Sequence, residues 1–267
     1  MKILFNLKMQ LKLFMLHLIK KLFRQINFAD LVKLMDAKLI ARFSKVGNNS
    51  FFDNRQFAWV EDLELNWEKI RQELDQVLEY KDKLPNFQDI SVEQYSITKD
   101  NLWKTYFLYG YGVKVENNCK MCPETTRLIE KIPGMKTAFF SILYPHKHIP
   151  KHRGYYKGVL RYHLGLVVPQ QKKDCWISVN NDVRYWEEGK SLIFDDTYLH
   201  EVENNTDEIR VVLFLDFVRP MYFPFSILNT LILKLLTFSP FIQNAKKNQE
   251  KWENRIKKEK REIAEII

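Results

Sequence analysis

The chain has 267 residues, of which 46% are hydrophobic and 14% aromatic, and it carries a formal net charge of +9. This length and composition allow a substantial buried core, which excludes a disordered tail. The three cysteines, Cys119, Cys122 and Cys175, are too few and too unevenly spaced for a disulfide scaffold, so a reducing compartment is favoured. Cys119 and Cys122 have the spacing of half a zinc site, but no second pair completes it, and two packed thiols are expected there.

The first 28 residues combine apolar side chains with six cations and contain no acid. Four of these cations lie with polar residues in one sector of a helical wheel, and most of the remaining arc is Ile, Leu, Phe and Met. Lys8 and Lys12 interrupt that arc, which disfavours a signal peptide or a spanning helix. Residues 1–28 are therefore predicted to form a basic amphipathic helix on an anionic membrane surface, with a helix packed on its own domain as the alternative.

Residues 29–131 are expected to form mainly helices and loops. One helix is predicted from about Asn66, which can act as its N-cap, because apolar residues recur at helical spacing from there to Leu78. A second helix is predicted to begin near Pro123 and to end before Pro133.

The sequence changes from Lys136 onward to short segments rich in aliphatic and aromatic residues, which are typical of strands. The predicted strands cover residues 137–144, 159–168, 174–179, 191–194 and 209–217. Proline, glycine, asparagine and lysine separate these segments, as an all-β sandwich or barrel requires.

Strand periodicity places several charged or polar side chains on the inner face of this barrel. In residues 160–166, Arg161 and His163 share one face, and in residues 209–217 Arg210 shares a face with Asp216. Polar groups inside a small barrel are costly unless they serve a ligand or one another.

An apolar stretch over residues 222–242 has nearly the length of a membrane span, but prolines, an asparagine and a lysine interrupt it. A short interfacial helix between Pro224 and Pro240 is therefore predicted in place of a span. Residues 245–267 alternate basic and acidic side chains, which is typical of a solvated helix, although this helix could also face anionic lipid.

Two histidines and one arginine indicate the chemistry. His152 and His200 are far apart in the sequence, each beside a strand-like segment, and two imidazoles are the minimum for holding a redox metal on a β-scaffold. Arg210, ten residues after His200, offers a planar fork that can hold a carboxylate of an acidic cosubstrate. Together they indicate a non-haem iron oxygenase that uses 2-oxoglutarate.

A series of fragments in a fixed order makes the chain recognisable. They are Ile132-Pro-Gly-Met, Ser141-Ile-Leu-Tyr-Pro, Pro150-Lys-His-Arg-Gly, Leu160-Arg-Tyr-His-Leu-Gly-Leu, Trp186-Glu-Glu-Gly-Lys, Ile193-Phe-Asp-Asp-Thr, His200-Glu-Val-Glu-Asn and Arg210-Val-Val-Leu-Phe-Leu-Asp. Residues 132–220 thereby resemble the aspartyl/asparaginyl β-hydroxylase family of Fe(II)/2-oxoglutarate dioxygenases, which includes bacterial lipid A 2-hydroxylases and ornithine lipid hydroxylases. Cys122-Pro, Ile132-Pro-Gly-Met and Val218-Arg-Pro-Met are more similar to the lipid A branch than to the peptide-modifying branch.

The resemblance implies a fold and a site. The fold is an all-β catalytic core, a cupin-like double-stranded β-helix or jelly roll over residues 132–220, with flanking α-helices. His152 and His200 match the two iron ligands, and with Arg210 they are the expected catalytic residues. Arg210 and Ser141 match the groups that hold the distal carboxylate of 2-oxoglutarate.

Two further residues, Arg161 and His163, match positions that line the cosubstrate and metal pocket. One departure from the wider dioxygenase pattern concerns the third metal ligand, because Gly154 stands where most such enzymes have a carboxylate. The aspartyl hydroxylase branch is similar in this respect, so water can fill that position.

The implied reaction is hydroxylation of a C–H bond with Fe(II), 2-oxoglutarate and O2, and with ascorbate as an auxiliary reductant. The favoured substrate is an acyl chain of an anionic membrane lipid, either lipid A or an amino lipid. The alternatives are hydroxylation of Asp, Asn or Pro side chains in a protein or peptide, and a non-catalytic membrane-bound β-barrel binding module. We expect membrane association with the catalytic domain in the cytoplasm, and no nucleic-acid partner.

Overall fold

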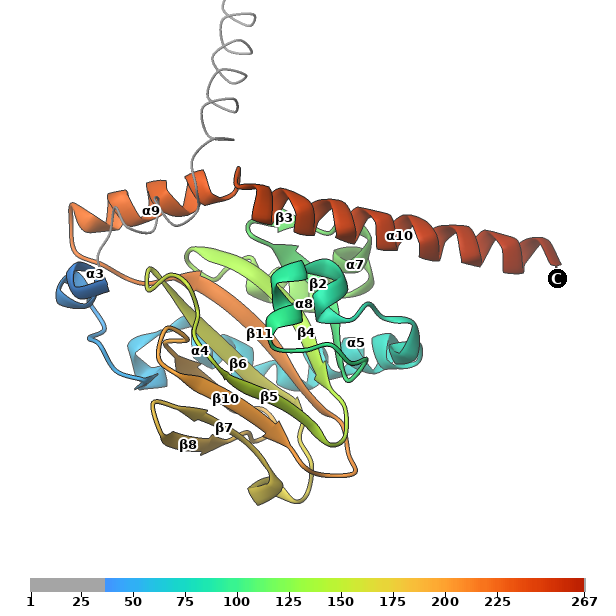
Figure 1. Ribbon diagram of the computed structural model, residues 1–267, viewed down its shortest axis with the longest axis horizontal. Helices are drawn as coiled ribbons and strands as arrows, with labels where there is room; N and C mark the ends of the chain where they lie inside the picture. The colour runs from blue at the N-terminus through green and yellow to red at the C-terminus, as the bar shows by residue number, and fades with distance from the viewer. Residues whose placement is uncertain (1–36, 267) are drawn as a thin grey trace, which may run out of the picture.

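The computed structural model describes residues 37–266 and places side chains as far as Ile256. The helix predicted over residues 1–28 lies outside this part of the chain. Two antiparallel sheets form the centre of the molecule, and two C-terminal helices run along one edge of it (Figure 1).

The larger sheet has seven strands and the smaller has four. In spatial order the larger sheet contains β1 (Phe51–Phe52), β9 (Ser191–Phe194), β6 (Val159–Val167), β11 (Arg210–Val218), β4 (Met135–Leu143), β2 (Trp103–Gly110) and β3 (Val113–Lys114). The smaller sheet contains β5 (Lys147–His152), β10 (His200–Asn204), β7 (Cys175–Val179) and β8 (Asp182–Tyr185).

The two sheets pack face to face through alternating apolar side chains. Phe139 and Phe214 from the larger sheet share one buried cluster with Ile177 and Val202 from the smaller sheet. Two antiparallel sheets around one apolar core are the arrangement of a jelly roll, which confirms the predicted all-β core with flanking helices.

Helices cover the outer face of the larger sheet and one edge of the domain. The helices are α3 (Ala37–Phe43), α4 (Trp59–Leu65), α5 (Trp67–Leu78), α6 (Phe87–Ile90), α7 (Glu116–Met121), α8 (Pro123–Ile129), α9 (Phe225–Leu236) and α10 (Pro240–Ile266). Short 3-10 turns are η1 (Asn54–Gln56), η2 (Lys81–Lys83), η3 (Val92–Ser96) and η4 (Lys172–Asp174). Ile70 and Leu74 of α5 join Leu164 and Leu213 of the sheet in a second buried cluster.

The two predicted helices, α5 and α8, begin where expected, but Asn66 does not cap the first turn of α5 as predicted. Asn66 precedes α5, yet its side chain makes no cap and its Nδ2 donates to the Asp62 carbonyl at 2.8 Å. The carboxylate of Glu73, on α5, accepts from the backbone N–H groups of Glu124 and Thr125 at 2.7 and 2.8 Å. Glu73 therefore caps α8 from outside that helix.

Six strands differ from the sequence expectation, and two of them, β1 and β3, have only two residues each. The strand β2 lies inside the range 29–131, which was expected to be mainly helical, and it pairs with β4 in the larger sheet. The strands β5, β8 and β10 were not predicted, because they are short and hold few of the aliphatic and aromatic residues on which the strand prediction relied. In β5 the proline at position 150 further hides the strand signal.

The C-terminal helices follow the prediction made from the prolines. Pro224 precedes α9, and Pro240 begins α10, so the apolar stretch is broken into two helices. Among the described helices, none by itself is both long enough and apolar enough to cross a membrane. Only α9 taken together with residues 240–256, across a bend of 53°, meets those criteria of length and composition.

Candidate active site

The two predicted metal-binding histidines lie side by side on neighbouring strands. His152 ends β5 and His200 begins β10, and the antiparallel register pairs these two residues directly. Their ring centroids are 4.0 Å apart. Residues 48 positions apart in the sequence are thus brought into contact by the pairing of two short polar strands.

Backbone carbonyls fix the tautomer of both rings. The Nδ1 atom of His152 lies 2.8 Å from the Pro150 carbonyl oxygen, and that of His200 lies 3.0 Å from the Tyr198 carbonyl oxygen. A carbonyl only accepts hydrogen bonds, so each Nδ1 carries the proton and each Nε2 presents a lone pair. Burial lowers the pKa of each histidine to about 4, so both rings are neutral near pH 7, as metal ligation requires.

The position next to this pair has no room for a carboxylate ligand from residue 154. A Cβ atom on Gly154 would lie 2.2 Å from Oδ2 of Asp196, and the Gly154 N–H donates to the Asp196 carbonyl at 2.7 Å. Within residues 37–266 no group of three His, Cys, Asp or Glu side chains has the geometry of a metal site. Two neutral imidazoles with free Nε2 atoms fit an Fe(II) ion whose remaining positions are filled by cosubstrate and water.

Arg210 is a buried cation without an anion. Its side chain is 1% exposed, and within the described chain neither Nε nor Nη1 has a hydrogen-bond partner. The guanidinium lies 4.5 Å from the centre of the Trp186 ring. Burial lowers the pKa of Arg210 to about 10, so the side chain stays charged at neutral pH. An uncompensated buried charge is costly, which points to an anionic ligand at this place.

Other buried polar atoms near Arg210 also have no partner among the described residues. They are both ring nitrogens of His163 and Nε1 of Trp186, and Oγ1 of Thr105 on β2 has no partner in the described chain either. Thr105 is the cross-strand neighbour of Ser141, whose Oγ accepts from Trp103 Nε1 at 3.0 Å. Because buried polar groups in native proteins are nearly always hydrogen-bonded, this set fits a ligand with several acceptor oxygens, such as 2-oxoglutarate.

One small cavity of about 30 Å³ brings the predicted site residues together. It is lined by Ser141, His152, Arg161, His163, His200 and Arg210, together with apolar side chains. This volume holds about two water molecules, so side chains must shift to admit a keto acid. All six residues predicted from the sequence therefore lie around one space.

Arg161 differs from Arg210 because its charge is already matched. Its Nε donates to Asp216 Oδ1 at 3.0 Å, and its Nη2 lies 3.0 Å from Asp196 Oδ2. Burial acts to lower the pKa of Arg161, but the two carboxylates outweigh it and raise the pKa above its usual value. Arg161 thus lines the cavity as part of an ion network.

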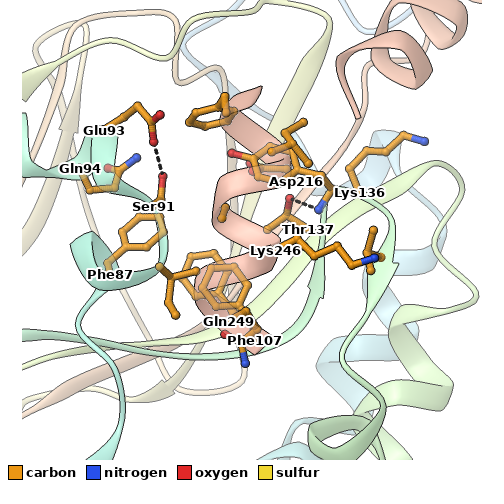
Figure 2. Close-up of a pocket in the computed structure, with 18 of the residues that line it drawn as sticks. Phe87, Ser91, Glu93, Gln94, Phe107, Lys136, Thr137, Asp216, Lys246 and Gln249 are labelled. Carbon is orange, nitrogen blue, oxygen red and sulfur yellow. Dashed lines mark hydrogen bonds between the residues drawn. The ribbon is translucent and has the colours of Figure 1, made fainter. Parts of the chain in front are cut away.

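A much larger groove of about 450 Å³ begins on the other side of this network. His152, Arg161 and Asp196 are among the residues that line it, and most of its wall is apolar. The outer wall comes from α9 and α10, and the facing wall from α6 and β2, as in the view of Phe87, Phe107 and Asp216 in Figure 2. Its volume is that of a small-molecule binding site.

Sequence reasoning missed the buried hydroxyl of Thr105 beside Ser141, a group unpartnered within the described chain, and missed this groove. The signal for Thr105 was the alternation of β2, which places Trp103, Thr105 and Phe107 on the inner face. The groove depends on how α9 and α10 pack against the sheet, and no local pattern in the sequence reveals that.

Comparison with known proteins identifies the family. The family model of aspartyl/asparaginyl beta-hydroxylases matches residues 64–220, more than half of the chain. The chain belongs to this family. It is a family of hydroxylases, which confirms the resemblance carried by the sequence fragments.

Two curated relatives act on different substrates. The chain is 47% identical over 215 residues to the ornithine lipid ester-linked acyl 2-hydroxylase of Rhizobium tropici, covering 80% of this chain and 76% of that protein. It is 36% identical over 170 residues to the human aspartyl/asparaginyl beta-hydroxylase, covering 62% of this chain but only 22% of that protein. Among solved structures, a prolyl hydroxylase from Trichoplax adhaerens has 13% sequence identity and a TM-score of 0.41, over 60% of this chain and 87% of that one.

Proposed function

We propose that the protein is an Fe(II)- and 2-oxoglutarate-dependent hydroxylase that acts on an acyl chain of a membrane lipid, either an amino lipid or lipid A. The observation that carries this proposal is the apolar groove of about 450 Å³ that His152 helps to line. An acyl chain fits such a groove, because apolar walls compensate an apolar ligand for the water it leaves. The lipid-modifying relative from Rhizobium tropici supports the same substrate class.

The residues of the site divide into three tasks under this proposal. His152 and His200 would hold the iron, and Arg210 would hold the distal carboxylate of the keto acid with help from Ser141. Bound iron, with O2 and 2-oxoglutarate, supplies the oxidising chemistry that turns C–H into C–OH while the keto acid becomes succinate and CO2, and ascorbate serves as an auxiliary reductant. The protein orients the target C–H bond and excludes water from it.

The ion network of Arg161 supports the orientation task. Asp216 on β11 and Asp196 in the loop after β9 both hold this guanidinium. The groove wall that Arg161 forms is therefore fixed in position. Phe214 lies beneath it, with its ring centre 4.3 Å from the guanidinium carbon. A fixed wall beside His152 would keep one carbon of the chain near the metal and the others away.

Hydroxylation of Asp, Asn or Pro side chains in a protein or peptide is the second candidate. It is favoured by the 36% identity to the human enzyme over 170 residues. A non-catalytic binding module is the third candidate. The retained histidine pair and the unpaired buried Arg210 argue against it, since a silent barrel has no use for an uncompensated charge.

We further propose that the catalytic domain works in the cytoplasm. Its three cysteines are all free and buried, which is compatible with a reducing compartment.

The test is mass spectrometry of lipids and proteins from cells that contain the active enzyme or its His152→Ala variant, grown under ¹⁸O2. A lipid acyl chain that gains one labelled oxygen atom only with the active enzyme supports the proposal. A labelled protein side chain with unlabelled lipids would instead support hydroxylation of a protein or peptide. If neither lipids nor proteins are labelled and anaerobic titration shows no binding of Fe(II), the result supports a non-catalytic binding module.

A further inference from the structure

The outer face of α9 is a strip of exposed apolar side chains. Phe223, Ile227 and Leu231 are 78%, 61% and 49% exposed and follow one another at intervals of four residues. Tyr222 and Leu228 extend the same strip. Within α9, Ile227, Leu228 and Leu231 are three or four positions apart and therefore lie on one side of the helix, while Tyr222 and Phe223 expose apolar side chains just before its first turn. A contiguous apolar surface on a folded domain marks a site of interaction.

The charges around the strip have one sign. No aspartate or glutamate occurs between Val218 and Gln249, nor in residues 37–52. The helix α3 lies beside α9, where Phe43 stacks on Phe225 with ring centroids 4.0 Å apart. Lys45 lies 5.6 Å from the centre of the Tyr222 ring, and Lys234 is exposed on α9 itself. Apolar side chains bordered by cations match the interface of an anionic bilayer.

The inner face of α9 is fixed to the catalytic core beside the histidine pair. Asn229 is fully buried, its Oδ1 accepts from the Tyr156 hydroxyl at 2.8 Å, and its Nδ2 donates to the Gly158 carbonyl at 2.8 Å. Both partners belong to the loop that follows His152. A Cβ atom on Gly158 would lie 2.2 Å from Asn229 Oδ1, so the helix and the loop are in close contact.

The same helix also forms part of the groove. Leu233 and Leu236, on the side of α9 opposite the strip, line the groove that His152 also helps to line. One helix therefore separates an exposed apolar surface from an apolar channel. The two surfaces lie along the edge of the molecule where α9 and α10 run in Figure 1, far from β8.

We infer that the outer face of α9, together with Tyr222 and Phe223 just before it, lies in the interface of an anionic bilayer and places the mouth of the groove at the membrane. The inference rests on the proposed lipid substrate for its purpose, but the contact itself is a property of this surface. The helix lies in the plane of the membrane, since its inner face is held by Asn229 and remains on the domain.

Site-specific labelling of the full-length chain tests the contact. The three native cysteines are buried, so a polarity-sensitive dye can be attached to Ile227→Cys, with Val183→Cys on β8 as the matched control. Val183 is 44% exposed and belongs to β8, which lies well away from α9 in Figure 1. With vesicles of phosphatidylglycerol and phosphatidylcholine, the dye at position 227 should shift to the blue and be quenched by spin-labelled lipid, and the dye at position 183 should not.

Three results would overturn the inference. They are no shift at position 227 when the protein sediments with vesicles, equal shifts at both positions, and a shift at position 227 that appears without lipid as protein concentration rises. The last result would assign the strip to a second copy of the chain.

A catalytic comparison separates this inference from the proposed function. The variant Phe223→Ser/Ile227→Ser/Leu231→Ser should hydroxylate bilayer lipid about tenfold more slowly or worse, yet act normally on the same lipid in detergent micelles. None of these three residues lines the groove. The paired substitution Val183→Ser/Tyr185→Ser is the control and should change neither rate. If the dye inserts but the unaltered enzyme hydroxylates no lipid, the membrane contact stands and the substrate proposal falls. Equal rates on both substrates for the triple variant would contradict the inference.

Discussion

Arg210 is buried and Arg161 is partly buried inside the barrel, but among the residues that the structure describes only Arg161 of the two has carboxylate partners. Asp216 and Asp196 each lie 3.0 Å from the guanidinium of Arg161, whereas Nε and Nη1 of Arg210 have no partner within the described chain. The two arginines therefore have different tasks. We propose that Arg161 maintains the wall between cavity and groove and that Arg210 binds an anionic ligand.

The first prediction concerns Arg210→Ala. Loss of a bidentate contact to a carboxylate in a desolvated pocket costs about 2–4 kcal/mol, so 2-oxoglutarate affinity should fall by roughly tenfold or more. Fe(II) affinity should change little, because neither imidazole is altered. Anaerobic calorimetry with each ligand measures both quantities, and the surface variant Arg127→Ala is the control. Unchanged cosubstrate affinity would show that a different group holds the carboxylate.

The second prediction concerns Thr105→Val, which removes an unpartnered buried hydroxyl and keeps the side-chain shape. Without ligand the variant should be as stable as the parent protein or more stable, since a buried unsatisfied hydroxyl costs about 1–3 kcal/mol. Affinity for 2-oxoglutarate should nevertheless fall severalfold. Thr126→Val is the matched control, because Thr126 already donates to the Cys119 carbonyl at 3.2 Å. The control should lose stability and retain affinity. A Thr105→Val protein with unchanged affinity would place this hydroxyl outside the cosubstrate pocket.

The third prediction concerns Gly154→Ala. The added methyl group would begin 2.2 Å from Asp196 Oδ2, so either the loop or the carboxylate must move. We expect a loss of about 1–3 kcal/mol in the free energy of unfolding, together with a strong loss of turnover. Gly110→Ala is the control for the stability measurement alone, because the nearest atom to its added Cβ is 4.0 Å away but Gly110 lines the groove. Chemical denaturation and turnover assays decide the point, and a Gly154→Ala enzyme with normal stability would show that Asp196 moves freely.

The fourth prediction concerns pH and the metal-free protein. Burial lowers the pKa of His152 and of His200 from 6.5 to about 4. The folded state binds fewer protons than the unfolded state between these values, so the stability from the neutral rings is full above pH 6.5 and is lost as pH falls towards 4. Burial raises the pKa of Asp196 and of Asp216, which acts in the opposite direction.

Comparison with a variant isolates the contribution of the histidines. Denaturation of the metal-free protein at pH 7 and at pH 5 should show a larger loss of stability than the same experiment with His152→Asn/His200→Asn. Equal losses in the two proteins would mean that the imidazoles remain solvated when the metal is absent.

The sequence predicted the inner faces of the long strands well, because period-two alternation in β6 and β11 places Arg161, His163 and Arg210 inside. Strand periodicity alone did not place His152 beside His200, and that expectation came from the family resemblance. That contact depends on two short polar strands and on a bulge between His200 and Val202.

Asn229 is a second residue whose structural environment cannot be predicted from its neighbours in the sequence. In the sequence it interrupts an apolar run and therefore suggests an exposed position. In the structure it is the buried residue that fixes α9 to the loop of Tyr156. The asparagine can be buried because its side chain makes hydrogen bonds to a hydroxyl and to a backbone carbonyl. Both of these partners lie about 70 positions away in the sequence.

The double role of α9 has a kinetic consequence. If the strip of Phe223, Ile227 and Leu231 rests in the bilayer while Leu233 and Leu236 line the groove, an acyl chain passes from one hydrocarbon environment to another without crossing water. The cost of about 0.8 kcal/mol per CH2 for exposure to water then never enters the rate. Turnover should consequently follow the mole fraction of substrate lipid in the vesicle, and dilution with inert phospholipid at constant total substrate should slow the enzyme in proportion.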